Sequence, residues 1–343
     1  MAKQTVAIGE TGEQLVSKLD NNFNELYNKS GGPGVVLSDA GAVGDGVTDD
    51  TAAIQAAINQ GVNVFGEYGM TYLISDTISF LDAIYDFGNA TVQATIGMAT
   101  KAMFYVDNKS NFVLKNVVLE CDNIAQYGLY ASVVNSNNAI FENMVVKHAT
   151  QDGVYFTSCM VTSVKNVYSL LNGRYGFFLN LCNQLVLNSC ETSDNVSDGI
   201  YITIGGGEWS GGVRIINSTI QVNGGNGINN VDTTSLVTVK DCWIEGNLGH
   251  GVIVGEGTKT LVKDNYIISG GTQDKYAIYV SGGASGAFQH NQLPASAPFD
   301  GGHVYYNNTG LTGDEASNGV VITPNWAMVI KGFTSYVLAV PWE

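Results

Sequence analysis

The chain has 343 residues, of which 13% are charged, 42 are glycine and only 5 are proline. This composition is typical of a β-rich repeat protein and argues against a mainly helical or disordered chain. The formal net charge of −16 argues against a nucleic-acid partner and against binding to an anionic membrane surface, because so acidic a chain cannot neutralise phosphates.

The N-terminal residues MAKQTVAIGETGEQ contain no apolar run of the kind found in secretory signals, and no later run approaches the length of a membrane span. We therefore expect a protein that is made in a cytoplasm and stays out of the membrane. Residues 9–29 are predicted to be helical, with apolar residues at the spacing of a helical seam: Val16, Leu19, Phe23 and Leu26. A helical seam this short is only marginally stable by itself. The helix therefore either joins three copies of the chain or packs on the first coil of its own chain.

Four aspartates lie close together in the stretch DAGAVGDGVTDDTAAIQAAI, residues 39–58. Such a cluster is typical either of an acidic site or of a turn that leads into a helix. Thr48 or Asp49 is a suitable N-cap and Gly61 a suitable stop, so we expect a helix over about 49–60. One face of this helix is apolar and consists of Ala53, Ile54, Ala57 and Ile58. We interpret the aspartates as turn and cap residues of a helix that covers the open end of the next domain.

A repeat follows, marked by a glycine in motifs such as DGVY, YGFF and DGIY. These glycines stand at 128, 153, 176, 199, 227 and 251, so they recur every 23 to 28 residues. A period of this length, built from short alternating strands and Asn/Gly turns, is the signature of a solenoid. The fold class that we expect is therefore all-β, a parallel β-helix over residues 33–293 with one coil per repeat.

Period-two alternation predicts which side chains point into this solenoid. The following residues are expected to face the core: Val146, Ile220, Ile244 and Ile267. Their neighbours are expected to face solvent: Val145, Tyr168, Glu191, Thr219, Trp243 and Tyr266. A ladder at one corner is predicted from the asparagines that precede repeat glycines by four residues: Asn172, Asn195, Asn223 and Asn247. The five cysteines show no CxxC pairing, so we expect them to be reduced and to serve as apolar filler.

The stretch at 39–58 resembles the N-terminal signature of the pectate-lyase-like superfamily, which includes phage tailspikes and polysaccharide-degrading enzymes. The preceding GETGEQLVSKLDNNFNELYNK resembles N-terminal segments of phage tail fibres and tailspikes. The resemblance implies a right-handed β-helix, a homotrimer, a place in the virion, and attachment to a phage tail or base-plate protein through residues 1–32. The superfamily includes lyases, hydrolases and binders, so the scaffold leaves the activity open. The repeat decays at LPASAPFDGG, and residues 294–343 are expected to be a C-terminal cap or a trimer contact.

Polysaccharide hydrolysis needs two carboxylates, about 5–5.5 Å apart for retention or 6.5–9.5 Å for inversion. A first candidate pair is Asp152 and Asp198, which precede repeat glycines two coils apart, about 9.6 Å along the axis. Candidate substrate contacts lie near them in the sequence: Arg174, Tyr175 and His250, with Glu208 and Trp209 from the insertion GGGEWSGG. Because aspartate also suits a turn before glycine, a purely structural role is the alternative.

Two motifs partly resemble the active site of polygalacturonases. VSDGI at 196–200 is similar to their first aspartate motif, and GHG at 249–251 matches their histidine motif. The paired aspartates that the family has between these motifs are absent, and GNG at 225–227 has Asn226 in that place. An amide cannot act as a general acid, so the resemblance does not extend to this chemistry.

A second candidate set lies on the predicted outer strand face. Glu191 and Asp194 are candidate catalytic acids in the motif SCETSDN. Candidate substrate contacts near them are Tyr168, Trp243 and Glu245. Resemblance to tailspike glycosidases, which have clustered acids on the side of the solenoid, favours this set. The alternative is that these are solvated carboxylates on an acidic surface.

A polysaccharide lyase would need a base and a group that neutralises a uronate. Tyr175 and Arg174 are the candidates, with basic neighbours at Lys147, His148 and Lys165. Ca²⁺ held by the two aspartates of the first pair could neutralise the uronate instead, whereas hydrolysis calls for no metal and no cofactor. We therefore expect a tailspike that binds and hydrolyses a bacterial surface polysaccharide, with a lyase or a non-catalytic receptor-binding fibre as alternatives.

Overall fold

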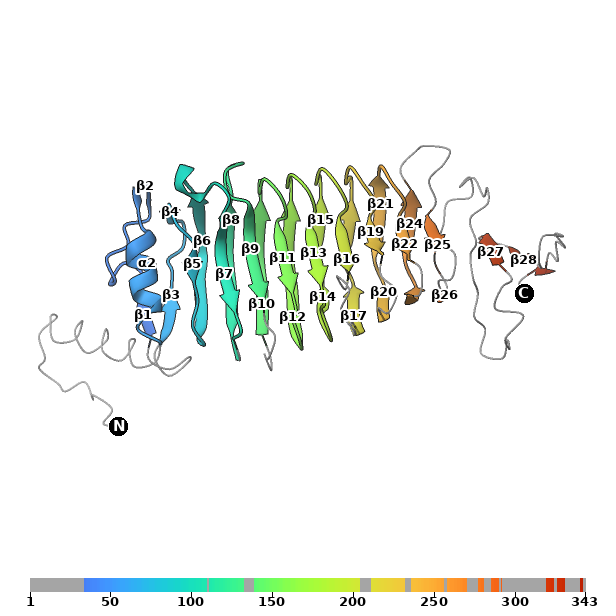
Figure 1. Cartoon of the computed structure of the whole chain (residues 1–343), viewed down its shortest axis with the longest axis horizontal. Helices are drawn as coiled ribbons and strands as arrows, with labels where there is room; N and C mark the ends of the chain where they lie inside the picture. Colours follow the sequence, from blue (N-terminus) through green and yellow to red (C-terminus); the bar gives the residue numbers. More distant parts are fainter. Residues whose placement is uncertain are drawn as a thin grey trace, which may run out of the picture.

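The chain winds into a parallel β-solenoid whose coils are stacked along one long axis (Figure 1). The computed structural model describes residues 34–109, 111–132, 139–203, 211–231, 236–255, 258–269, 277–280, 285–289, 291, 319–323, 326–330 and 340–341. The predicted N-terminal segment 1–32 and most of the region 294–343 lie outside these residues. No helix among the described residues is long and apolar enough to span a membrane.

Two parallel sheets form the walls of the solenoid, and we call the 17-stranded one sheet A and the nine-stranded one sheet B. Sheet A consists of β1 (Gly34–Val36), β2 (Asp45–Asp49), β3 (Asn63–Phe65), β4 (Thr71–Ile74), β6 (Ile84–Ala94), β8 (Val113–Glu120), β10 (Ala139–Lys147), β12 (Thr162–Leu170), β14 (Val186–Asn188), β15 (Glu191–Ser193), β17 (Gly211–Ile216), β18 (Thr219–Gln221), β20 (Leu236–Lys240), β21 (Trp243–Asn247), β23 (Lys259–Lys263), β24 (Tyr266–Ser269) and β26 (Ser285–Gln289). Sheet B consists of β5 (Ile78–Ser79), β7 (Ala102–Asp107), β9 (Tyr127–Ser132), β11 (Val154–Thr157), β13 (Phe177–Asn180), β16 (Ile200–Thr203), β19 (Ile228–Asn230), β22 (Val252–Val254) and β25 (Ile278–Val280). A separate antiparallel sheet consists of β27 (Gly319–Thr323), β28 (Trp326–Ile330) and β29 (Val340–Pro341).

The predicted helix at the N-terminal end of the solenoid is present as α2 (Thr51–Ile58), and a short 3₁₀ helix, η1, follows at Ile96–Met98 (Figure 1). Ile54, Ala57 and Ile58 of α2 are buried against the first coils. An apolar helix face thus covers core that the first coil would otherwise expose to water.

The aspartates before α2 are turn and helix-start residues, as predicted, but the N-cap is Asp50 rather than Thr48 or Asp49. The Asp50 carboxylate turns back and accepts hydrogen bonds from the N–H groups of Val43 (2.6 Å) and Gly44 (3.0 Å). The preceding side chain, Asp49, accepts a hydrogen bond from the Thr51 N–H at 3.0 Å. The cap position therefore lies one residue after Asp49, but the side-chain hydrogen bond to the start of the helix comes from Asp49, because the Asp50 carboxylate closes the preceding turn.

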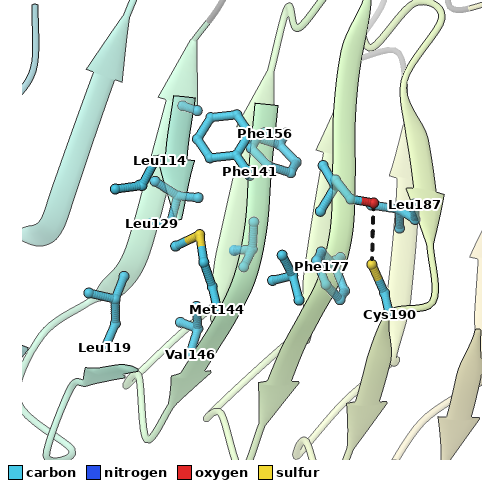
Figure 2. Packing of buried hydrophobic residues seen from close by; sticks show 14 of the residues in the cluster. Leu114, Leu119, Leu129, Phe141, Met144, Val146, Phe156, Phe177, Leu187 and Cys190 are labelled. Carbon is cyan, nitrogen blue, oxygen red and sulfur yellow. Dashed lines mark hydrogen bonds between the residues drawn. The ribbon is translucent and has the colours of Figure 1, made fainter. Parts of the chain in front are cut away.

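The core is a continuous apolar column between the sheets, and the predicted inward residues Val146, Ile220, Ile244 and Ile267 are all fully buried. Figure 2 shows side chains from both sheets meeting there, with the Phe141 and Phe156 rings 5.2 Å apart between centroids. Burying one such ring stabilises the fold by about 2–3 kcal/mol.

All five cysteines are buried and none forms a disulfide, as predicted. The Cys190 thiol lies 3.6 Å from the carbonyl oxygen of Val164 (Figure 2), and burial raises its pKa to about 12. Such thiols are apolar filler rather than reactive groups.

The predicted asparagine ladder forms one buried corner of the solenoid. Each Nδ2 donates to the Oδ1 of the next asparagine along the axis, at 2.8 Å in every step: Asn172 to Asn195, Asn195 to Asn223, and Asn223 to Asn247. The repeat glycines lie against this ladder. A Cβ at Gly199 would meet the Nδ2 of Asn223 at 2.8 Å and the Gly227 carbonyl oxygen at 2.9 Å, so close approach explains the glycine.

Candidate functional site

Sheet B carries a continuous column of aromatic side chains on its outer face. The outward residues of five successive coils are in register: Tyr105, Tyr130, Tyr155, Phe178 and Tyr201. We call these five residues the aromatic column. Successive ring centroids lie 5.5, 4.6, 4.6 and 5.6 Å apart, and the last three pairs are stacked. Because stacked rings cover one another's faces, the column presents mainly ring edges and hydroxyl groups to solvent.

Asp152 lies beside this column and is held in an ion pair. Its side chain is fully buried, and Arg174 donates to both of its carboxylate oxygens, with Nε 2.7 Å from Oδ1. The N–H of Tyr175 donates to the same Oδ1 at 3.2 Å. The guanidinium lies over the rings of Tyr175 and Phe178, 4.9 and 5.5 Å from their centroids. The structure thus brings Asp152, Arg174 and Tyr175 together, with the carboxylate turned away from solvent.

Asp198, two coils further along, is also engaged by its neighbours. Its carboxylate accepts hydrogen bonds from the N–H (2.6 Å) and Nδ2 (2.8 Å) of Asn226 and from Nδ2 of Asn229 (2.9 Å). Asn226 in turn accepts from the N–H of His250 at 2.8 Å. Residues at this position therefore bind the backbone of the next coil, which is the structural role considered from the sequence. A catalytic role for the two aspartates stays a prediction.

The groups considered for a lyase are arranged unfavourably. Burial and the nearby charge of Asp198 raise the pKa of Tyr175, so its phenol is protonated at neutral pH and is a poor base. Lys147 and His148 pair instead with Glu120, their nitrogens 3.1 and 2.8 Å from its two carboxylate oxygens.

Sheet A carries the second candidate set on its outer face. The predicted outward residues stand in register on successive coils: Val145, Tyr168, Glu191, Thr219, Trp243 and Tyr266. We call this row the Trp243 column. Trp243 is 45% exposed and stacks on Tyr266, with centroids 4.0 Å apart and an interplanar angle of 25°. Its other face therefore points along the axis toward the coil of Thr219, a side chain too small to cover an indole.

Two glutamates flank this exposed indole face. Glu191 stands one coil beyond Thr219 and accepts a hydrogen bond from Nε2 of Gln221 at 3.2 Å. Gln221 is in register with Glu245, which follows Trp243 by two residues on β21 and therefore faces the same way. The predicted residues Glu191, Trp243 and Glu245 thus lie on one surface around Thr219 and Gln221.

Two other predicted residues, Asp194 and His250, stand apart from this surface. Asp194 is exposed at the corner after β15, where its φ of 57° places it in a left-handed turn. Glu208 and Trp209 lie outside the described residues. His250 lies on the sheet B side and stacks on Tyr279, with centroids 4.7 Å apart.

The sequence analysis missed the aromatic column, although the signal was present. The residue two places after the repeat glycine is aromatic for four of the six repeat glycines: Tyr130, Tyr155, Phe178 and Tyr201. Only the glycine was compared between coils, so the aromatic residues two places later were overlooked. Gln221 was also missed, because a glutamine in a strand has no sequence signature of its own.

Within the described part of the chain, no group of three or more His, Cys, Asp or Glu side chains is arranged to hold a metal ion. Asp152 and Asp198 have separate sets of donors around them, namely Arg174 for the first and two asparagines for the second. The geometry accordingly offers no direct support for Ca²⁺ between them.

Comparison with known proteins identifies the scaffold. The sequence profile of the family described as the right-handed β-helix region matches residues 101–229 and 206–293, which confirms the predicted fold class. No curated protein matches the sequence significantly.

Several solved structures have a similar shape. ORF18 of Geobacillus virus E2 has a TM-score of 0.61 and 14% identity, over 97% of this chain and 80% of that one. The A-module of the mannuronan C-5 epimerase AlgE4 from Azotobacter vinelandii has a TM-score of 0.49 and 16% identity, over 76% and 95% of the two chains. The surface adhesin PfbA of Streptococcus pneumoniae has a TM-score of 0.38 and 10% identity, over 78% and 82%. At such identities the likeness concerns the fold alone.

Proposed function

Since this chain belongs to the right-handed β-helix family, we propose that it is a phage tailspike that binds a bacterial surface polysaccharide on the Trp243 column and hydrolyses it there. The similarity to a phage protein over nearly the whole chain is compatible with a place in the virion. The fold itself supplies only a long regular face, so the proposal depends on the side chains of that face.

The observation that carries the proposal is the half-exposed indole of Trp243. Its face toward Tyr266 is covered, whereas its face toward Thr219 lacks a large neighbour in the column. A large exposed aromatic face beside hydrogen-bonding groups is an unfavourable surface for a protein without a ligand. It suits a sugar ring, whose C–H groups pack on the indole while its hydroxyls bond to side chains around it. Glu191, Gln221 and Glu245 are placed to accept and donate those bonds.

The same surface supplies the carboxylates for hydrolysis. Glu191 and Glu245 belong to coils two apart, about 9.6 Å along the axis, and Glu245 is also offset by two residues, about 6.6 Å, along the strand. The Glu191 side chain reaches toward this offset, because it is bonded to Gln221 on the coil between them, and further leaning of the two side chains would bring the carboxylates toward the range for inversion. In the mechanism that we propose, one carboxylic acid protonates the leaving oxygen and the other carboxylate activates a water molecule. Asp194, at the corner three residues after Glu191, is a further candidate in this hydrolase.

Non-catalytic receptor binding is the second candidate, and one observation favours it. Asp152 and Asp198, the other pair considered for catalysis, are buried and fully engaged in hydrogen bonds. If Glu191 and Glu245 also only bind hydroxyls, the chain holds its glycan without cleaving it. A lyase is less favoured, because Arg174 is ion-paired with Asp152 and the Tyr175 phenol, whose pKa is raised, is protonated at neutral pH.

Assembly as a homotrimer is part of the proposal. Apolar side chains stand exposed on successive coils along the corner of the asparagine ladder: Leu171, Val196, Val222 and Leu248. Burial of this row between copies would remove apolar surface from water. Light scattering of the purified full chain tests this point, and a monomer at micromolar concentration would contradict it.

Release of reducing ends from a panel of capsular polysaccharides and lipopolysaccharides tests the function. Wild type is expected to release ends from at least one glycan, without the ultraviolet absorbance of an unsaturated uronate. Glu191→Gln and Glu245→Gln should each lower the rate at least a hundredfold while binding is kept, whereas Glu142→Gln, on the same sheet, should not. Unsaturated products would establish a lyase, and binding without any cleavage would establish the receptor-binding fibre.

A further inference from the structure

A short turn on each coil divides the later part of sheet A into two rows of strands. The strands β17, β20 and β23 lie before the turn, and β18, β21 and β24, which carry residues of the Trp243 column, lie after it. The inward residues of the first row, such as Val239 and Val262, are buried. Four cationic side chains stand on its outer face: Arg214, Lys240, Lys259 and Lys263. We call these four residues the basic face.

The cations of the basic face recur along three successive coils. Lys240 and Lys263 are in register on adjacent strands, about 4.8 Å apart along the axis. Arg214 is in register with Thr238, two residues before Lys240, and Lys259 is the first residue of β23. Like charges directly opposite one another destabilise a sheet, so the stability of the solenoid does not account for this arrangement. An anion bound between the cations would reduce their repulsion.

Two carboxylates at the turn offset part of this charge. The Nζ of Lys240 lies 2.8 Å from a carboxylate oxygen of Asp241, and the Nζ of Lys263 lies 3.8 Å from one of Asp264. The other two cations of the basic face are exposed, and neither forms an ion pair with a residue that the structure describes. Four positive charges against two negative ones make this surface locally positive, although 31 acidic side chains outnumber 15 basic ones in the whole chain.

Arg214 and Lys259 are therefore the groups of the basic face that are open to an anionic partner. A guanidinium donates two parallel hydrogen bonds to a carboxylate or a phosphate, and an ammonium binds either group as a point charge. The two side chains belong to coils two apart, about 9.6 Å along the axis. A chain molecule with acidic groups at regular intervals fits this spacing better than a single small anion does.

We propose that the basic face binds acidic groups of the polysaccharide, so that the substrate is an anionic polysaccharide with carboxylate or phosphate groups. This inference rests on the proposed function and names its substrate class. Lys240 precedes Trp243 by three residues, so the basic face and the Trp243 column meet at the turn. The carboxylates of Glu191 and Glu245 repel acidic groups from the Trp243 column, where a neutral sugar packs on the indole. The basic face attracts those acidic groups on the other side of the turn.

The double variant Arg214→Gln/Lys259→Gln tests the inference, because both side chains are exposed and have no ion pair to lose. Its fold should be kept, which thermal melting verifies. Lys101→Gln/Lys109→Gln is the matched control, since it removes two positive charges beside the two ends of β7 in sheet B. A general effect of net charge would weaken binding in both variants, whereas the proposed contact is lost only in the first.

Calorimetric titration with the glycans of the panel, in about 50 mM and about 500 mM NaCl, is the measurement. Wild type should bind an anionic glycan at low salt. Arg214→Gln/Lys259→Gln should bind it about tenfold more weakly, about threefold for each cation, and the control should stay within about twofold of wild type. At high salt the difference should shrink, because ions screen exposed charges. Carboxyl reduction of the glycan should abolish the difference if its charges are carboxylates, and a difference that survives reduction assigns them to phosphate.

Two results would overturn the basic face while the proposed function stands. One is that every glycan that wild type binds is neutral, and the other is equal binding of an anionic glycan by wild type and Arg214→Gln/Lys259→Gln. Binding of a DNA duplex as tight as that of the glycan would overturn the assignment to a polysaccharide. Absence of glycan binding by wild type would overturn the proposed function together with the inference.

Discussion

Arg174 and Asp152 form a two-point ion pair across adjacent coils, in which a half-exposed guanidinium is bound by a carboxylate with no exposed surface. Burial of a carboxylate is tolerated here because Arg174 and the N–H of Tyr175 occupy its oxygens. Arg174→Met should therefore destabilise the protein by about 3–5 kcal/mol, since it leaves a buried charge unpaired.

The double variant Asp152→Asn/Arg174→Met is the informative control for this pair. Asn226 occupies the same position of a later coil and accepts the next N–H as an amide, so asparagine at 152 should do the same. Chemical denaturation should show that the double variant recovers most of the loss. Equal destabilisation of the single and double variants would show that the arginine acts by packing on Tyr175 and Phe178 instead.

The asparagine ladder should be sensitive to exchange of amide for carboxylate. Asn195 accepts from Asn172 and donates to Asn223, and an ionised aspartate at 195 can only accept. Asn195→Asp should cost about 3 kcal/mol at neutral pH, because two acceptors then face each other in a buried site. Asn166→Asp, in an exposed ladder, should cost less than about 1 kcal/mol.

The pH dependence of this variant has a definite sign. The buried site favours a protonated carboxyl, so the folded-state pKa of the carboxyl introduced by Asn195→Asp should lie above its unfolded value of about 3.9. The stabilising form is present below that unfolded value and is lost as pH rises through the folded-state pKa. Unfolding experiments between pH 4 and pH 7 should therefore show the variant losing stability relative to wild type on going up in pH.

In wild type, Glu120 should make the protein more stable as pH rises, which is the opposite of the effect of Asn195→Asp. Burial favours its neutral form, but hydrogen bonds from His148 and the Asp122 N–H, together with Lys147, lower its pKa below the ordinary 4.5. Its contribution to stability is present above that ordinary value and is lost as pH falls through the lower folded-state pKa. Glu120→Gln should be less stable than wild type at pH 7, and the difference should shrink on acidification toward pH 3.

A matched exposed carboxylate distinguishes this effect from general acid denaturation. Asp76 pairs with Lys101 where both side chains are largely exposed, so Asp76→Asn should change stability by less than about 1 kcal/mol. If the Glu120→Gln and wild-type curves stay parallel from pH 7 to pH 3, the ion cluster at Glu120 does not contribute as argued.

Periodic features could be predicted from the sequence, because they repeat at the spacing of one coil. The repeat glycines, the asparagines four residues before them and the inward apolar residues all recur with each coil, and their positions follow from stacking. The same reasoning predicted that Glu191, Thr219 and Trp243 would share one outer column, and the strand register confirms it.

Side-chain contacts that do not recur on every coil could not be predicted from the sequence. Nothing in the sequence shows that Arg174 pairs with Asp152 of the preceding coil. Nor does it show that the Asp198 carboxylate accepts hydrogen bonds from the side-chain amides of Asn226 and Asn229. These depend on side-chain rotamers in adjacent coils, and motif matching at each aspartate alone cannot reveal them. The N-cap at Asp50 was misplaced for a similar reason, since its carboxylate bonds to a turn six and seven residues earlier.

Binding of bacterial surface polysaccharides to wild type and to Trp243 variants tests the central claim most directly. Wild type should bind at least one capsular polysaccharide or lipopolysaccharide, Trp243→Phe about as well, and Trp243→Ala at least about tenfold more weakly. Tyr68→Ala, which removes an aromatic ring that is 84% exposed near the N-terminal end of the solenoid, should bind as wild type does. Unchanged affinity of Trp243→Ala for a glycan that wild type binds would contradict the account and place recognition elsewhere on the solenoid.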